Sequence, residues 1–154
     1  MELLSFDNPV FVTYAASAAV LGLKYLGQGW ATVVAMITTD SGLMNPEDFK
    51  KTPFNPNPRP EQAEEAGSVA RSRRMHRNDT ENLPPFFAVG LLFVLAEPSL
   101  FWARILLFGV VGARIAHALA YSTGQIHEIR AAFFSLGSLL TMAMAGWVLW
   151  VALF

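Results

Sequence analysis

The chain alternates long apolar segments with short polar ones. From this pattern we expect four helices, at about residues 9–38, 71–96, 100–122 and 128–153. A membrane-spanning helix needs about 20 residues to cross roughly 30 Å of hydrocarbon, and the first, third and fourth segments reach that length. The second is continuously apolar only over residues 83–96, so it spans a membrane only if its polar first turns are helical and shielded by protein.

The fourth segment separates a membrane bundle from a soluble one. Helices at the surface of a soluble bundle keep a polar face, whereas residues 131–154 offer almost none. The sequence therefore predicts an all-α, integral-membrane four-helix bundle that forms a single domain over residues 1–154. Residues 39–70 form its long loop, which is rich in proline and cannot be helical across 55–60. The alternative is a soluble protein with four buried helices.

Composition agrees with the membrane prediction, because only 15% of the residues are charged and 53% are hydrophobic. Seven of the eleven Lys and Arg residues lie between residues 38 and 79. Cytoplasmic loops of membrane proteins carry the excess of basic residues. We therefore expect residues 38–79 and the turn at 122–128 to lie in the cytoplasm, with both termini on the other side.

Several classes of chemistry are excluded by composition alone. The chain has no cysteine, so it has no disulfide, no thiolate metal site and no cysteine nucleophile. Its net charge of -1 argues against binding to nucleic acid, which requires a basic surface. We expect no metal ion and no nucleic-acid partner.

Polar residues cluster where the second helix begins. Helical spacing places Arg74, Asn78 and Glu81 on one stripe, with Arg77 one turn before Glu81. Ionisable residues at membrane depth are costly and usually face the interior of a bundle, where they serve function. Arginine forks bind carboxylates, so this stripe suits a small anionic ligand.

A second stripe lies on the third helix, where Arg114, His117 and Tyr121 share one face. Glu81 can pair with Arg114 across the two helices, which reduces the cost of burying both charges. Arg130 lies at the start of the fourth helix, at the same end of the bundle. The two stripes and Arg130 thus predict one pocket that faces the cytoplasm.

Each of these residues also has a purely structural interpretation. The arginines before Met75 can meet anionic headgroups, and the pair Glu81–Arg114 can simply hold two helices together. His117 can be a core histidine, and Tyr121 an interfacial anchor. Lys24, the single charge within the first apolar segment, receives no role from the sequence.

Three motifs, taken together, resemble one known family. Residues 74–82 read Arg-Met-His-Arg-Asn-Asp-Thr-Glu-Asn, residues 45–48 read Asn-Pro-Glu-Asp, and residues 112–121 contain an Arg-x-x-His-x-x-x-Tyr pattern. Their order and spacing resemble the MAPEG family, the membrane-associated proteins in eicosanoid and glutathione metabolism. The likeness covers residues 8–150 and is greatest to the branch of microsomal glutathione transferases and prostaglandin E synthases.

The resemblance implies a four-helix protomer that forms a homotrimer and holds glutathione between subunits near the cytoplasmic face. It further implies that Arg130 lies by the glutathione sulfur and favours the thiolate, that Arg114 pairs with Glu81, and that a hydrophobic small molecule or lipid reaches the site from the membrane. The residues expected to bind glutathione are Arg74, Arg77, Asn78, Glu81, His117, Tyr121 and Arg130.

Three positions depart from the family pattern. Basic residues usually follow the first helix, but here residues 38–42 read Thr-Thr-Asp-Ser-Gly. Ala131 stands where the prostaglandin synthases have serine, and Phe134 where they have tyrosine. These departures favour a general glutathione transferase, with peroxidase activity as a possible addition, over the specialised isomerase.

The sequence thus predicts a membrane-bound glutathione transferase that attacks hydrophobic electrophiles and has glutathione, membrane lipids and a hydrophobic acceptor as its partners. Two alternatives within the family stay open: a prostaglandin-E-synthase-like isomerase and a non-enzymatic, lipid-binding membrane scaffold. A small transporter is disfavoured, because four helices without inverted repeats do not fit that class. The host membrane, bacterial or endoplasmic reticulum, is not distinguished.

Overall fold

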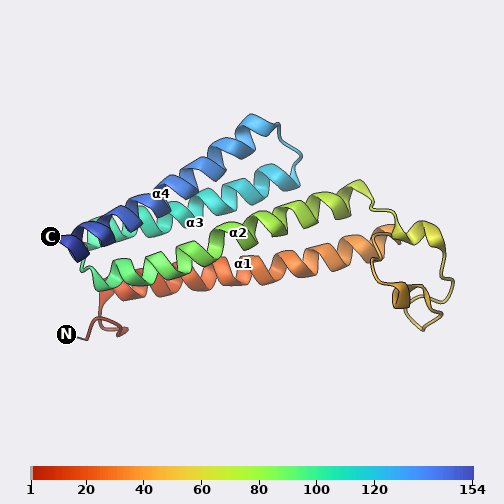
Figure 1. Cartoon of the computed structure of the whole chain (residues 1–154), viewed down its shortest axis with the longest axis horizontal. Helices are drawn as coiled ribbons and strands as arrows, with labels where there is room; N and C mark the ends of the chain where they lie inside the picture. The colour runs from red at the N-terminus through yellow and green to blue at the C-terminus, as the bar shows by residue number, and fades with distance from the viewer. Residues whose placement is uncertain (1) are drawn as a thin grey trace.

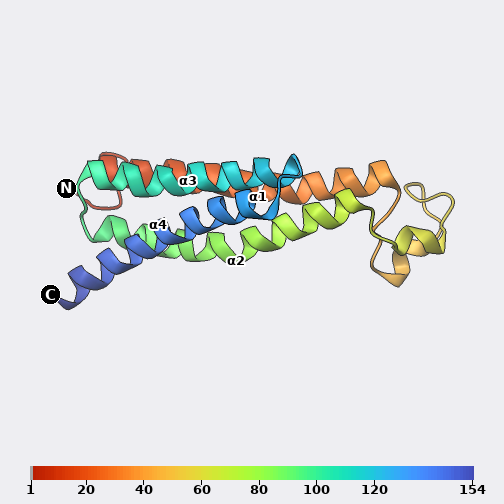
Figure 2. The same ribbon diagram turned by 90° about the horizontal axis from the view of Figure 1, so that it is seen from above.

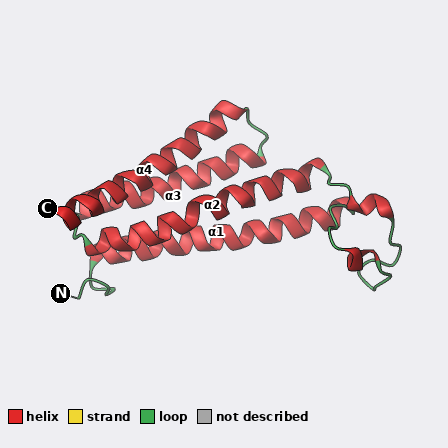
Figure 3. Ribbon diagram, in the orientation of Figure 1, coloured by secondary structure: helices red, strands yellow, loops and turns green. Residues whose placement is uncertain are grey.

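The computed structural model describes residues 2–154, and over these residues it contains helices and no strands (Figures 1 and 3). Four long helices follow one another: α1 (Pro9–Thr39), α2 (Gly67–Leu95), α3 (Leu100–Ser122) and α4 (His127–Leu153). Two short 3-10 helices, η1 (Pro46–Phe49) and η2 (Pro60–Ala63), lie in the loop between α1 and α2. The prediction of an all-α four-helix bundle is confirmed.

The helix boundaries follow local sequence signals. Asn8 caps α1, because its side-chain oxygen accepts a hydrogen bond of 3.0 Å from the Val10 amide, and Pro9 supplies the fixed φ that suits a first helical turn. α2 begins at Gly67, four residues before the expected start at 71, since residues 68–70 contain nothing that breaks a helix. It then continues through Pro84 and Pro85 without ending.

The helices pack around one apolar core, formed by large side chains such as Leu21, Phe86, Phe93, Leu107 and Met144. A close approach between α1 and α2 depends on Gly90. A Cβ atom at this position would lie 2.9 Å from the Tyr14 ring, so only glycine leaves room for the tyrosine. The Tyr14 hydroxyl in turn donates a 2.9 Å hydrogen bond to the Phe87 carbonyl.

Three of the helices, α1, α3 and α4, are long and apolar enough to cross a membrane. Their outward faces carry large apolar side chains, among them Leu23, Trp30, Phe101 and Leu139. α4 buries only Gly137 and Met144 fully, and it runs obliquely across the bundle (Figure 2). Apolar faces of this extent require a lipid environment, so the chain is an integral membrane protein.

The loop between α1 and α2 extends beyond the ends of both helices (Figure 1), and Gln62 organises it. Gln62 is only 2% exposed, and its side chain bonds to Asp40, Asn55 and the backbone amide of Arg59. The Gln62 amide, and after it the Arg59 guanidinium, lower the pKa of the Asp40 carboxyl below its usual value. The loop is therefore a hydrogen-bonded unit attached to the C-terminal end of α1.

We expect Gln62→Ala to loosen this loop while leaving the helical bundle intact. The substitution removes the hydrogen bonds of Gln62 to Asp40, Asn55 and Arg59, each worth about 0.5–1.5 kcal/mol. Limited proteolysis in detergent should show faster cleavage within residues 40–66, with an unchanged midpoint of helix unfolding. Asn57→Ala is the matched control, since Asn57 is exposed in the same loop. Equal cleavage rates in the two variants would contradict the role of Gln62.

Candidate functional site

A cluster of charges lies buried between α1, α2 and α3. The Asp79 side chain on α2 is 0% exposed, and its two oxygens bind different cations. Oδ2 accepts from Lys24 Nζ on α1, and Oδ1 accepts from Arg114 Nη2 on α3 at 2.5 Å. The same Nη2 donates a 2.8 Å hydrogen bond to Asn78 Oδ1. One carboxylate therefore ties three helices together.

The expected ion pair between Glu81 and Arg114 is wrong for this chain, because Arg114 pairs with Asp79 instead. The reason is helical geometry. Residues two apart on an α-helix point about 200° apart around its axis, so Glu81 faces outward and is exposed when Asp79 faces the core. Asp79 lies four residues after buried Met75 and four before buried Leu83.

Sequence reasoning could have found this pairing. The spacing from Met75 through Asp79 to Leu83 places the carboxylate on the apolar stripe of its helix, where a charge requires a partner. Lys24 is the single charge inside the first apolar segment, and we assigned it no role. A lone cation on one helix and a lone acid on the buried stripe of the next are a signal for an ion pair.

A second group of predicted residues meets at the start of α4. The rings of His117 and Tyr121, one turn apart on α3, have centroids 5.0 Å apart. The Arg130 guanidinium carbon lies 4.6 Å from the centre of the Tyr121 ring, a distance at which a cation is attracted to the π-face. Phe134 closes the group, with its ring centroid 6.5 Å from that of His117. α3 and α4 thus bring His117, Tyr121 and Arg130 together as predicted.

Three of the remaining predicted residues lie on α2 and are not drawn into either group. Arg74, Arg77 and Glu81 are exposed, and none of the ion pairs formed within residues 2–154 involves them. Asn78 is half-buried and reaches Arg114. Within one protomer, therefore, α2 presents two arginines and a carboxylate outward, one turn or less from the buried cluster.

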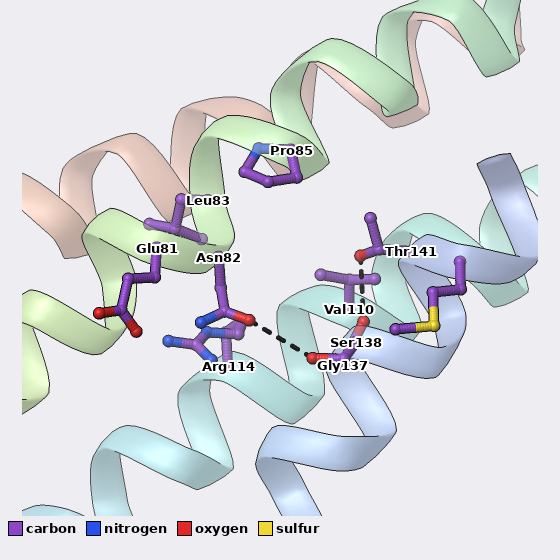
Figure 4. A pocket seen from close by; sticks show the side chains of 10 residues that line it. Glu81, Asn82, Leu83, Pro85, Val110, Arg114, Gly137, Ser138 and Thr141 are labelled. Carbon is purple, nitrogen blue, oxygen red and sulfur yellow. Dashed lines mark hydrogen bonds between the residues drawn. The ribbon is translucent and has the colours of Figure 1, made fainter.

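A cavity of about 200 Å³ lies beside the buried cluster, between α2, α3 and α4. Figure 4 shows Arg114 extending toward Asn82, with the neighbouring Glu81 also lining the cavity, and a hydrogen bond of 3.4 Å from the Ser138 hydroxyl to Asn82 Oδ1. Pro85 and Met142 are among the apolar residues that line the remainder. Neither Asn82 nor Ser138 was predicted as a site residue, although Asn82 ends the motif at residues 74–82.

Several buried donors of the site have no hydrogen-bond partner within the described chain. They are Nε and Nη1 of Arg114 and Nε of Arg130. Buried donors without partners cost free energy, and guanidinium groups have no acceptor function of their own. The donor set is therefore suited to an anionic ligand that supplies carboxylate or thiolate acceptors.

The helices are long enough to span a membrane, they enclose a charged cluster, and further cations lie at one end. These features define a polytopic membrane protein with an intramembrane polar site. Residues 13–150 match the MAPEG family, and the chain belongs to this family. It is 35% identical over 138 residues to microsomal glutathione S-transferase 1 of Sus scrofa, which covers 90% of this chain and 88% of that protein. The human protein of that name is 34% identical over 139 residues, 90% of this chain and 88% of its own.

Prostaglandin E synthase of Homo sapiens is also similar, at 34% identity over 156 residues, 97% of this chain and 94% of that protein. The two kinds of relative differ little in identity, so identity alone does not separate them. The family resemblance seen in the motifs is confirmed, and the membrane-helical fold with it.

We expect Asp79→Asn to destabilise the protein strongly, because it leaves Lys24 and Arg114 buried without a counter-charge. Breaking one partner of a buried ion pair costs about 3–5 kcal/mol. Thermal unfolding in detergent measures the loss. Glu81→Gln is the matched control, since Glu81 is exposed on the same helix and should change the unfolding midpoint little. Equal destabilisation by both variants would restore Glu81 as a structural partner of Arg114.

Proposed function

We propose that this protein is a membrane-bound glutathione transferase. The observation that carries the proposal is the set of guanidinium donors on α2, α3 and α4 that have no hydrogen-bond partner within the described residues. Arg114 and Arg130 both hold buried donors without partners, and Arg74 and Arg77 are free on the neighbouring face of α2. Relatives named as glutathione S-transferases, similar over 90% of the chain, support the same conclusion.

Glutathione is a tripeptide with two carboxylates, one ammonium group and one thiol, and the site offers a complementary group for each. Arg74 and Arg77 suit the carboxylates, because guanidinium forks bind carboxylate oxygens in pairs. Glu81 suits the ammonium group. Asn78, His117 and Tyr121 would hold the peptide portion between them.

Arg130 would act on the sulfur. The thiolate is the nucleophilic form of a thiol, and a fixed cation nearby lowers the pKa of the thiol. Arg130 is held against Tyr121 at 4.6 Å, which fixes the position of its charge. In transfer, the sulfur forms a bond to the electrophilic carbon and the leaving group departs with its electron pair, while the thiol proton passes to solvent. In a peroxidase reaction, two glutathione molecules reduce a hydroperoxide to an alcohol and water and become a disulfide.

The outward direction of Arg74, Arg77 and Glu81 supports a site completed by a second copy of the chain. Charged side chains at the membrane-facing surface of a helix are costly unless another protein surface covers them. We therefore also propose a homotrimer, with glutathione bound between subunits. The concentration of basic residues in 38–79 supports a cytoplasmic location for this end of the bundle.

A glutathione-dependent isomerase of the prostaglandin E synthase kind is the second candidate, favoured by 34% identity to that human enzyme over 97% of the chain. Ala131 and Phe134 argue against it, since they lack the hydroxyls expected from the family resemblance. Product analysis with an endoperoxide substrate separates the two enzymes. A non-enzymatic lipid-binding scaffold would bind no glutathione and form no thiolate.

We expect Arg130→Ala and Arg130→Ser to keep glutathione binding while lowering turnover on chlorodinitrobenzene. Loss of one fixed donor at a developing charge typically costs about 10²–10³-fold in rate. Binding is measured by equilibrium dialysis, and the thiolate by its ultraviolet absorbance, which should disappear in both variants. Arg104→Ala is the control, because Arg104 is an exposed arginine near the other end of α3. Undiminished turnover without Arg130 would remove it from the mechanism.

A further inference from the structure

Lys24 is a buried cation that the proposed mechanism does not use. Its side chain is 15% exposed, and it extends from the middle of α1 to the Asp79 carboxylate. Together with Arg114 it gives the cluster two positive charges against one negative charge. An ion pair of Asp79 with Arg114 alone would already be neutral, so charge balance does not explain why a second cation is present.

The geometry of the carboxylate gives the explanation. An arginine facing a carboxylate usually binds both of its oxygens through two parallel hydrogen bonds. Here Lys24 occupies Oδ2, so Arg114 reaches Oδ1 alone, through Nη2 at 2.5 Å. This single contact leaves Nη2 placed to donate a second hydrogen bond, at 2.8 Å, to Asn78.

The bond to Asn78 fixes which way its amide points. A guanidinium group only donates hydrogen bonds, so the atom of Asn78 that meets it is the oxygen. The amide nitrogen Nδ2 then points away from Arg114, and no hydrogen bond within residues 2–154 occupies it. Asn78 thus presents an NH₂ donor, beside the exposed Arg77, to whatever binds at this face of α2.

We propose that Lys24 is a positioning residue for ligand binding. By holding Asp79 Oδ2, Lys24 limits Arg114 to a single carboxylate oxygen, Asp79 Oδ1. Arg114 then bonds the Asn78 oxygen and turns the Asn78 amide donor toward the bound tripeptide. The proposal rests on glutathione being the ligand. Lys24 itself touches no ligand. Without Lys24, the Asp79 carboxylate can bind Arg114 through both oxygens. The guanidinium group then moves away from Asn78, and the Asn78 amide loses the hydrogen bond that orients it.

The test is a double-mutant cycle on glutathione affinity with Lys24→Met and Asn78→Ala. We expect each single variant to weaken binding about 10-fold, roughly the value of one hydrogen bond to a charged or strongly polar group. The double variant should bind no worse than Asn78→Ala, because Lys24 acts only through Asn78. Lys24→Arg, which keeps a cation at the position, should retain more affinity than Lys24→Met. Tyr25→Phe is the control, since Tyr25 is the adjacent residue of α1 and bonds Thr80 rather than Asp79.

Asn78→Asp tests the amide orientation without altering Lys24. It replaces the presented donor with an acceptor, so we expect weaker binding than in Asn78→Ala; affinity equal to that of the wild type would overturn the proposal. Additive losses in the double variant would also overturn it and make Lys24 merely structural. If the wild-type protein binds no glutathione, the proposed function fails and this inference fails with it. If the wild type binds and Lys24→Met binds equally well, only this inference fails.

Discussion

The bundle depends on the burial of a single carboxylate. Asp79 has no contact with solvent, and it bonds α2 to Lys24 of α1 and to Arg114 of α3. In a medium of low dielectric constant, such charges are tolerated only when they are paired and hydrogen-bonded. The shared acid therefore fixes the rotation of three helices about their axes, since each must direct one particular side chain to the same point. The apolar core alone cannot do this, because lipid and core attract apolar side chains about equally.

The same rotation sorts the residues proposed for function. With Asp79 directed inward, its neighbours Arg77 and Glu81 necessarily point outward, and Asn78 lies at the boundary, where it reaches Arg114. The ion pair and the proposed ligand-binding face are thus two sides of one helical turn. A change that rotates α2 would disturb the fold and the site together. The second group, on α3 and α4, is linked to the first through α3, which carries both Arg114 and His117.

Much of the fold could be predicted from the sequence, because a helix that crosses a lipid bilayer must be long and almost entirely apolar. Three apolar segments of spanning length, and the concentration of charge in residues 38–79, predicted membrane helices close to those observed. The start of α2 was placed four residues late, because its first residues, Gly-Ser-Val-Ala, follow Ala66 without a side-chain cap that would mark a helix start. The loop was expected to be rich in proline and non-helical across 55–60. Its organisation by Gln62 could not be foreseen, because those hydrogen bonds join residues up to 22 positions apart.

The candidate site was predicted less completely than the fold. The spacing in α3 placed His117 beside Tyr121, and the turn after α3 brought Arg130 to the Tyr121 ring. The acid paired with Arg114 was misassigned, because opposite charge was considered without asking which of two nearby acids faces inward. Asn82 and Ser138 meet only through the packing of α2 against α4, and the sequence of either helix alone contains no sign of it.

α4 differs from the other helices in how little of it the protein encloses, with two fully buried residues across 27. Its inner face packs against α3 and α2, and the rest of its surface must be covered by lipid or by other protein. Arg130, at the first turn of this helix, is therefore supported from one side only within the protomer. What surrounds the protomer becomes part of the support of the Arg130 charge, together with its contact to the Tyr121 ring.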